Sequence, residues 1–196
     1  MKYYLFTFLI LLQILLELNL SLLKIDSNVC DIKIKIKGAG IQSILGRYGN
    51  FKLRDEIYLG ESKIGKISRR INLTENENTI ILRWNSTFQS CKGMFYFCSN
   101  ITEIDFSSFN NPDLDDVSDM FRGCKSLTSI HFSSFFTSKV TSMSGMFYDC
   151  NNLLSLNLST FNTSNVINMG LMFFNCISLT SLNLLHFNIC LVYVLI

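Results

Sequence analysis

The sequence has little charge, little proline and almost no histidine. Its 196 residues include 16% charged residues, one Pro and two His, beside 48% hydrophobic residues. So apolar a chain can build a core, which argues against an intrinsically disordered protein. Residues 24–93 carry 13 Lys and Arg against 7 Asp and Glu, and residues 94–188 carry 3 against 7. Neither part has the dense basic stripe of a nucleic-acid interface, so we expect no nucleic-acid partner.

Motifs for metal, phosphate and nucleophilic chemistry are also lacking. The seven Cys include no CxxC pair, which structural zinc sites usually contain. The glycines of "GAGIQSILG", residues 38–46, resemble a phosphate loop only weakly, because no Lys-Ser or Lys-Thr follows. There is no nucleophile elbow, and the two His, His131 and His186, occupy different repeat positions. We therefore expect no metal, no cofactor and no enzymatic activity.

Residues 1–23 are the first feature that is present. Lys2 precedes an almost uninterrupted apolar run, as in a secretory signal. The run is long enough to span a bilayer, but Gln13, Glu17 and Asn19 in its second half would be costly there. A cleaved signal peptide and a signal anchor both remain open. We expect a secreted or cell-surface (extracellular) protein that meets the membrane only through this segment.

Residues 24–90 are expected to form a small β-rich N-terminal capping region. "CDIKIKIK", residues 30–37, alternates apolar and charged residues with period two, as does a strand with one buried face. "NTIILRW", residues 78–84, is a second strong strand. "EIYLGESKIGKI", residues 56–67, suggests two short strands around Gly60.

The rest of the chain is a repeat. Four similar sixteen-residue stretches begin at Met94, Met120, Met146 and Met172, with the same spacing each time. A fixed period of this length is typical of stacked repeat proteins. In the third copy, apolar residues at three- and four-residue spacing predict a short helix, with Thr137 and Ser138 as its cap, and three leucines then predict a short strand. The helical set is Val140, Met143, Met146, Phe147 and Cys150, and the strand set is Leu153, Leu156 and Leu158.

The phrase MFxxCxxLxxLxLSxFxTSxVxxM, clearest between Met146 and Met169, resembles the BspA-like leucine-rich repeat of many bacterial and protist surface proteins. The resemblance covers residues 94–188. It implies a leucine-rich-repeat-like solenoid, secreted or displayed at the cell surface, with adhesion or protein binding as its role and with no catalytic residues.

The predicted fold class is therefore an α/β repeat solenoid, leucine-rich-repeat-like, with one short strand plus one short helix per 26-residue repeat, preceded by the small β-rich N-terminal region. The expected divisions are a signal peptide or signal anchor at 1–23, the capping region at 24–90, a four-repeat solenoid at 91–188 and an apolar C-terminal tail at 189–196.

Four of the cysteines recur with the period of the repeat, namely Cys98, Cys124, Cys150 and Cys176. On successive rungs about 5 Å apart these side chains form a ladder. Packing in the core is the favoured interpretation, because free Cys behaves as a small buried hydrophobe. Disulfides between rungs, or a metal, are the alternatives, and the sequence leaves the redox state open.

The outward strand positions are the predicted partner-binding set. By two-residue alternation, two polar columns are expected to contain Glu103, Asp105, Ser129, His131, Ser155, Asn157, Ser181 and Asn183. Asp105 and His131 should be neighbours on adjacent rungs. We predict non-enzymatic binding of a protein or glycan ligand through this face.

Candidate glycosylation sites and two alternative roles complete the predictions. Asn72, Asn85, Asn100 and Asn162 begin N-x-Ser or N-x-Thr triplets, as does Asn157, which is the doubtful site because it lies in a predicted strand. One alternative role is a structural envelope component that self-associates through its uncapped C-terminal repeat. The other is a truncated copy of a longer surface protein.

Overall fold

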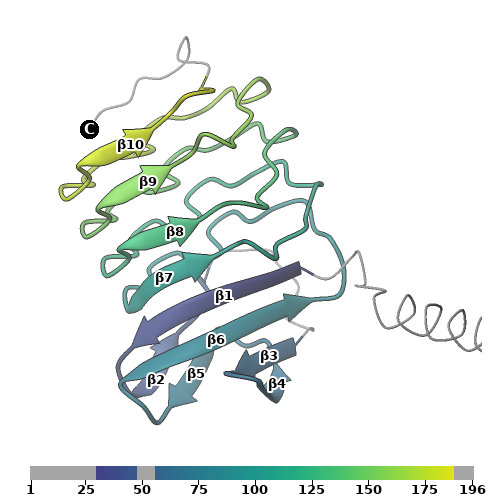
Figure 1. The fold of residues 1–196 in the computed structure, drawn as a ribbon, viewed down its shortest axis with the longest axis vertical. Coiled ribbons are helices and arrows are strands. Elements are labelled where there is room, and N and C mark those ends of the chain that lie inside the picture. The colour runs from purple at the N-terminus through teal and green to yellow at the C-terminus, as the bar shows by residue number, and fades with distance from the viewer. Residues whose placement is uncertain (1–29, 48–55, 188–196) are drawn as a thin grey trace, which may run out of the picture.

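The computed structural model describes residues 30–47 and 56–187, and in them the chain forms ten strands and no helix (Figure 1). The strands are β1 (Cys30–Lys37), β2 (Gly40–Ser43), β3 (Glu56–Leu59), β4 (Ser62–Lys66), β5 (Arg70–Leu73), β6 (Glu77–Trp84), β7 (Ile101–Asp105), β8 (Ser129–His131), β9 (Ser155–Asn157) and β10 (Ser181–Asn183).

Six strands form one mixed sheet in the order β4-β3-β6-β1-β7-β8. The N-terminal strands pair antiparallel, and β1 lies between β6 and β7, antiparallel to both. From β7 onward the pairing is parallel. β2 and β5 form a separate antiparallel pair, and β9 and β10 a separate parallel pair. β1 is thus the strand that joins the antiparallel cap to the repeats.

The strands predicted at 30–37 and 78–84 are confirmed as β1 and β6, and those around Gly60 as β3 and β4. The isoleucines of β1 are buried, whereas Lys33, Lys35 and Lys37 on the opposite face are exposed. This alternation follows from the pleat, which points successive side chains to opposite faces.

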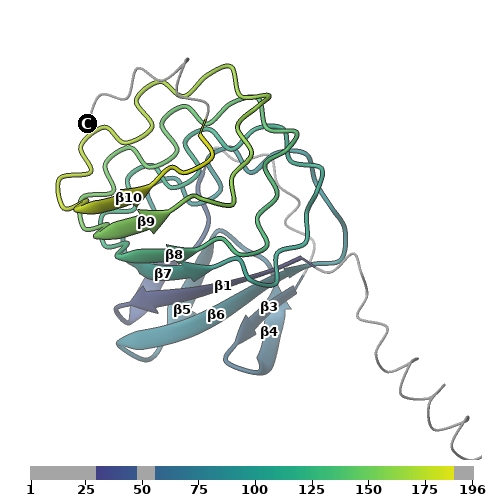
Figure 2. The same ribbon diagram turned by 45° about the horizontal axis from the view of Figure 1, so that its top comes forward.

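The repeats form a stack of coils, each placing one short strand beside the strand of the next copy (Figure 2). β7 pairs with β8, and β9 with β10, in register, so that equivalent residues of adjacent copies lie side by side. Isolated parallel bridges join Ser90 to Asp116, Asp116 to Ser142 and Ser142 to Asn168 with the same register. One copy therefore makes one coil.

The predicted α/β fold class with one short helix per repeat is wrong. The segment expected to be helical in the third copy, around Met146, is a run of turns, and no described residue lies in a helix. Thr137 does not cap a helix either. Its hydroxyl donates to the carbonyl of Asn162 at 3.1 Å and accepts from the Asn162 N–H at 2.8 Å, so it ties two coils together.

The backbone hydrogen bonds explain why no helix forms. Alternate N–H groups donate to the next coil: Gly145 to the carbonyl of Gly170 at 2.9 Å, and Phe147 to that of Met172 at 2.9 Å. The intervening donors close four-residue turns, as when the N–H of Tyr148 donates to the carbonyl of Gly145 at 3.0 Å. A helix would need these same N–H groups for hydrogen bonds within the segment. In the stack they donate to carbonyls of the next coil instead, so no helix can form.

Left-handed backbone conformations separate these turns in every copy. The first set of positive-φ positions is Gly93, Asp119, Gly145 and Leu171, and the second, four residues later, is Phe97, Gly123, Asp149 and Asn175. A right-handed helix cannot pass through such residues. Inward side chains such as Met146, Phe147 and Cys150 still recur at three- and four-residue spacing because consecutive turns also return them to one side. The spacing alone therefore could not distinguish turns from a helix.

The core is continuous from the cap through the repeats. Equivalent phenylalanines stack between coils, with centroid separations of 5.8 Å for Phe95–Phe121, 5.4 Å for Phe121–Phe147 and 5.6 Å for Phe147–Phe173. A second stack runs through Phe109, Phe135, Phe161 and Phe187. Each coil thus buries its apolar side against its neighbours.

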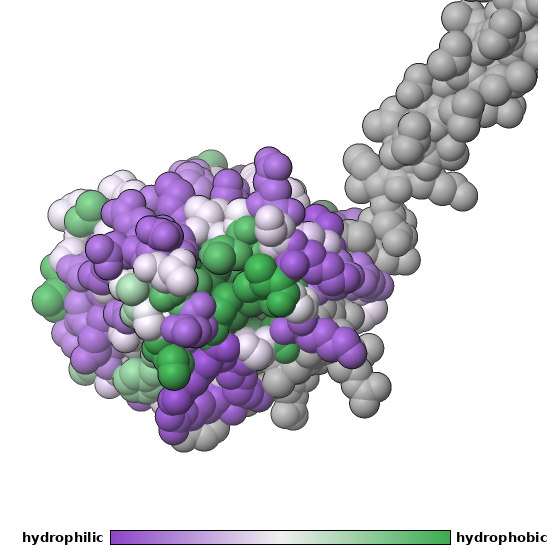
Figure 3. Space-filling view, turned by 90° about the horizontal axis from the view of Figure 1, so that it is seen from below, coloured by the Kyte–Doolittle hydropathy of each residue, from purple (hydrophilic) through white to green (hydrophobic). Residues whose placement is uncertain are grey.

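The surface of the cap end is partly apolar (Figure 3). Ile41 of β2 and Ile64 of β4 are exposed side chains of this region. The predicted signal segment 1–23 and the predicted C-terminal tail 189–196 lie outside the described residues. Within the part of the chain that the structure describes, no helix is long and apolar enough to cross a bilayer.

Candidate functional site

The outer face of β7 to β10 carries all eight predicted partner-binding residues. The register places Glu103 beside Ser129 and Asp105 beside His131. In the last two copies Ser155 lies beside Ser181, and Asn157 beside Asn183. All eight side chains are exposed or partly exposed. The structure thus brings them together as two columns, and the predicted proximity of Asp105 and His131 is confirmed at the level of backbone register.

The cap extends this face beyond the repeats, which the sequence did not indicate. In the pairing of β1 with β7, Lys33 lies opposite Asp105 and Lys35 opposite Glu103. The ammonium of Lys35 forms an ion pair with the Glu103 carboxylate at 2.8 Å. The alternating lysines of β1 could have suggested an exposed face, but not which strand would lie beside them.

The second column has a structural role at three of its four positions. The Oδ1 atoms of Asp105, Asn157 and Asn183 accept hydrogen bonds from the backbone N–H two residues later, at 2.8, 3.1 and 3.2 Å. Asp and Asn commonly close such turns where a strand ends. His131 differs: its side chain is exposed and has no hydrogen bond or ion pair among the described residues. His131 is therefore the member of this column that is available to a partner.

Two small cavities border His131. One, of about 190 Å³, is lined by Lys33, Lys35, Glu103, Ile104, Asp105 and His131. The other, of about 240 Å³, is lined by Ile130, His131, Phe132, Ser133, Asn157 and Thr160. Both are smaller than the pockets that usually enclose a drug-sized ligand. They are better suited to single side chains that project from a larger partner.

The second cavity coincides with an interruption of the strand ladder. β8 is the last strand of the six-stranded sheet, and β9 begins the separate pair. At the residue after the strand, Phe106 and Phe132 in the first two copies give way to Leu158 and Leu184 in the last two. The change from Phe to Leu thus falls between β8 and β9, where the ladder is interrupted. The second cavity lies at the same place, because its lining includes His131 of β8 and Asn157 of β9.

The cysteine ladder is a packing feature. Cys98, Cys124, Cys150 and Cys176 are free and buried. The thiols of the last three each donate to the carbonyl of a Phe in the preceding copy, at 3.1, 3.2 and 3.0 Å. Burial raises the pKa of the Cys98 thiol to about 12 and that of Cys176 to about 11. Such thiols stay protonated and poorly reactive. Within the described residues no three potential metal ligands cluster.

The candidate glycosylation sites differ in their availability. Asn72, Asn85 and Asn162 are exposed. Asn100 is partly buried, and its amide donates to Oε1 of Gln42 at 2.6 Å. Asn100 is therefore the least accessible of the four. Asn157, the doubtful site in a strand, is exposed but closes a turn.

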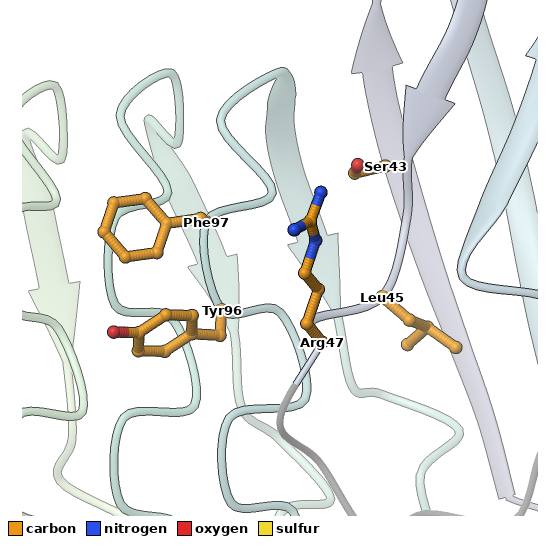
Figure 4. A pocket seen from close by; sticks show the side chains of 5 residues that line it. All are labelled: Ser43, Leu45, Arg47, Tyr96 and Phe97. Carbon is orange, nitrogen blue, oxygen red and sulfur yellow. The ribbon is translucent and has the colours of Figure 1, made fainter.

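A larger cavity, of about 390 Å³, lies away from the strand face and was not predicted. It is lined by Ser43, Leu45, Arg47, Tyr96 and Phe97 (Figure 4). Only an alignment of the four copies gives a hint of it, because Phe97 occupies a position that is Gly, Asp or Asn in the others. Ser43, Leu45 and Arg47, which complete the lining, could not be found in this way.

A family model described as "Mycoplasma protein of unknown function, DUF285" matches residues 60–134 and 89–193, which together cover more than half of the chain. No curated protein and no solved structure matches the sequence significantly. The matched region contains the whole described coil stack and the cap strands from β4 onward.

Proposed function

The chain belongs to the DUF285 family, a family of unknown function, and we propose that it is a BspA-like secreted or cell-surface protein that binds a partner protein through the outer strand face. The resemblance of its 26-residue phrase to BspA-like repeats supports this role. The apolar N-terminal segment with its leading Lys2 supports export.

The observation that carries the proposal is the position of His131 between two small cavities. On one side lie Lys33 and the Lys35–Glu103 ion pair, and on the other lies Asn157. A protruding partner side chain could enter either cavity and meet charged or hydrogen-bonding groups. A face with this mixture of polar groups suits a specific contact better than a non-specific electrostatic one.

The geometry around His131 also favours binding over catalysis. The Asp105 carboxylate accepts from the backbone N–H of Ser107. Among the described residues, no hydrogen bond joins it to His131. A catalytic His usually needs an orienting group and a nucleophile in hydrogen-bond reach. The proposed role is therefore non-enzymatic.

The test uses the full chain and cultured epithelial cells or decellularised matrix as the binding surface. We expect His131→Ala and Lys33→Ser each to weaken binding by roughly tenfold, the size expected at a buried contact centre. Lys125→Ser removes an exposed charge outside this face and serves as the matched control. Asp105, Asn157 and Asn183 should be left intact because their loss would disturb the turns.

Treating the surface with glycosidases separates a protein from a glycan partner. Binding that survives the treatment but falls in both face variants supports a protein partner. If binding disappears with the glycans, the partner assigned here is wrong. If His131→Ala and Lys33→Ser bind as well as Lys125→Ser, the strand face is not the contact surface.

A further inference from the structure

Phe97 stands in a backbone conformation that disfavours it. Its φ is 57°, in the left-handed region that bulky side chains seldom occupy. The equivalent residues of the other copies, Gly123, Asp149 and Asn175, are types that tolerate this region. The Phe97 side chain is nevertheless 50% exposed, so burial does not fully account for it. Strained residues held at a cavity are candidates for function.

The segment opposite Phe97 is fastened to the first copy by close backbone packing. The N–H of Gly46 donates to the carbonyl of Met94 at 2.7 Å, and the Arg69 guanidinium donates to the carbonyl of Gly46. A Cβ at Gly46 would lie 2.2 Å from the carbonyl oxygen of Gly93, so only glycine fits there. The two walls of the cavity are therefore held in a set position before any ligand arrives.

One wall of the cavity is aromatic. The rings of Tyr96 and Phe97 meet edge to face with centroids 4.7 Å apart. They project side by side from the first copy (Figure 4). The Arg122 guanidinium of the second copy lies 5.9 Å from the centroid of the Tyr96 ring and 4.0 Å from that of the Tyr148 ring in the third copy, so Arg122 supports Tyr96 from one side. An aromatic wall of this kind presents electron-rich faces that attract C–H groups as well as cations.

The other wall of the cavity contains the guanidinium of Arg47 and the hydroxyl of Ser43. Arg47 is exposed and has no hydrogen bond or ion pair with the described residues, and Ser43 and Leu45 flank it in the cavity lining. A guanidinium placed in this way beside a cavity is well suited to a carboxylate, which it can hold through two parallel hydrogen bonds. The Ser43 hydroxyl can both donate and accept.

We propose that the cavity between Ser43, Arg47, Tyr96 and Phe97 binds an acidic monosaccharide unit, a pyranose ring that carries a carboxylate. The apolar face of the pyranose would lie on the half-exposed Phe97 ring with Tyr96 beside it, its carboxylate on Arg47, and a hydroxyl on Ser43. The cavity volume of about 390 Å³ is at the lower end of the range for small-ligand sites, which favours one sugar unit over a folded partner.

This site is independent of the proposed function. It shares no lining residue with the two cavities beside His131. Loss of binding at one should therefore leave the other unchanged, and His131→Ala is a built-in control for the sugar experiment.

The test is saturation-transfer NMR and titration of the full chain with methyl glycosides of N-acetylneuraminic acid and glucuronic acid. Methyl glucoside and acetate are the neutral and sugar-free comparisons. We expect at least one acidic glycoside to bind and both comparisons to bind roughly tenfold or more weakly, because each lacks one of the two contacts. Equal binding of acetate would show a simple anion site. Binding of none of the four would also overturn the proposal.

Two variants assign the binding to the cavity. Phe97→Asn copies Asn175 of the fourth copy and should leave the thermal midpoint nearly unchanged, because relief of strain offsets the lost ring contact. We expect it to reduce binding of the acidic glycoside at least tenfold. Arg47→Gln should remove the preference for acidic over neutral glycoside, whereas Arg70→Gln, at an exposed arginine of β5, should keep it. Unchanged binding in Phe97→Asn, or a strong acid preference in Arg47→Gln, would contradict the assignment.

If Phe97→Asn instead unfolds at a much lower temperature, the ring serves the stack by packing on Gly123. A Cβ at Gly123 would lie 2.7 Å from the Phe97 ring, so this contact is close. A large drop in the midpoint together with normal glycoside binding by Arg47→Gln would overturn the proposal.

Discussion

The antiparallel cap and the coil stack use different means to hold strands together. In the cap, β1 and β6 pair over eight residues, and the Arg83 guanidinium forms two hydrogen bonds to Asp31, at 2.6 and 2.8 Å. In the stack the strands have only three to five residues. Adjacent copies are joined instead by stacked Phe side chains and by backbone hydrogen bonds between equivalent turns. Long strands stabilise themselves locally, whereas short repeated ones depend on neighbouring coils.

The two regions nevertheless share one core. β1 pairs antiparallel with β7, so the first coil is covered on one side by the cap and on the other by the second coil. The cap therefore covers the apolar side of the first copy and pairs with its strand, as each copy does for the next one. Changes at this junction should show whether the regions unfold together.

The largest effect is expected from Phe106→Ala. The Phe106 ring is fully buried and contacts Phe109, Phe132 and Phe135 at centroid distances of 5.3, 5.5 and 5.0 Å. Its removal should lower the free energy of unfolding by about 3–5 kcal/mol in urea titrations. Phe136→Ala, at a residue 46% exposed, should change it by less than about 1 kcal/mol. Similar losses in the two variants would show that the stack is not a close-packed core.

A smaller loss should follow Gly46→Ala, which breaks the contact between the cap and the first coil. The new Cβ would approach the Gly93 carbonyl oxygen to 2.2 Å. Overpacking of this kind costs about 1–3 kcal/mol, measured by urea unfolding. In Gly170→Ala the Cβ meets its nearest neighbour, Oδ1 of Asn168, at 3.4 Å, so that variant is the control and should be close to neutral. If Gly46→Ala were neutral too, the junction would be adaptable.

The buried thiols, which include Cys30 in the cap and the four cysteines of the ladder, predict that the free energy of unfolding depends on pH. Burial raises the pKa of Cys98 from 9.0 to about 12. Below about pH 9 the thiol is protonated in both states and its contribution is complete. As the pH rises from about 9 towards 12, only the unfolded state releases the proton, so the free energy of unfolding falls by up to about 1.4 kcal/mol per pH unit. Urea titrations at about pH 8 and pH 10 measure this, and Cys98→Ala should show a shallower decline. An identical decline would exclude Cys98 as a source.

The smallest effect is expected at the ion pair that crosses from cap to stack. Lys35 and Glu103 are 2.8 Å apart, but their side chains remain 52% and 39% exposed. Glu103→Gln should therefore cost only about 0.2–1 kcal/mol, and less in high salt. Glu61→Gln, in the exposed turn between β3 and β4, is the control for loss of one negative charge. A salt-independent loss of several kcal/mol would mean that the pair holds the junction.

The sequence was most informative where the spacing of its apolar residues matches the repeat of only one backbone structure. The alternation of residues 30–37 predicted β1, and the constant repeat length predicted that Asp105 and His131 would be neighbours. It was wrong about the helices, because stacked turns place Met146, Phe147 and Cys150 inward at the same spacing as a helix would. Nothing local indicates that the N–H of Phe147 donates to Met172 of the next coil.

The candidate sites show the same limit. The outward positions could be identified by counting residues, but the use of Asp105, Asn157 and Asn183 to close turns became visible only in the folded chain. The cavity at Phe97 depends on residues 43–47, which lie about fifty positions earlier in the chain. Such a meeting of distant segments has no signature in either one.

The sequence by itself determined that this chain stacks copies of constant length, because each copy repeats the same inward residues and cannot bury them alone. It also determined the alternating strands of the cap through the two-residue period of the pleat. Only the tertiary structure decided that the copies would contain turns without helices, and which polar groups would remain available. Both outcomes depend on where backbone donors find acceptors, and in a stack those acceptors belong to the neighbouring coil.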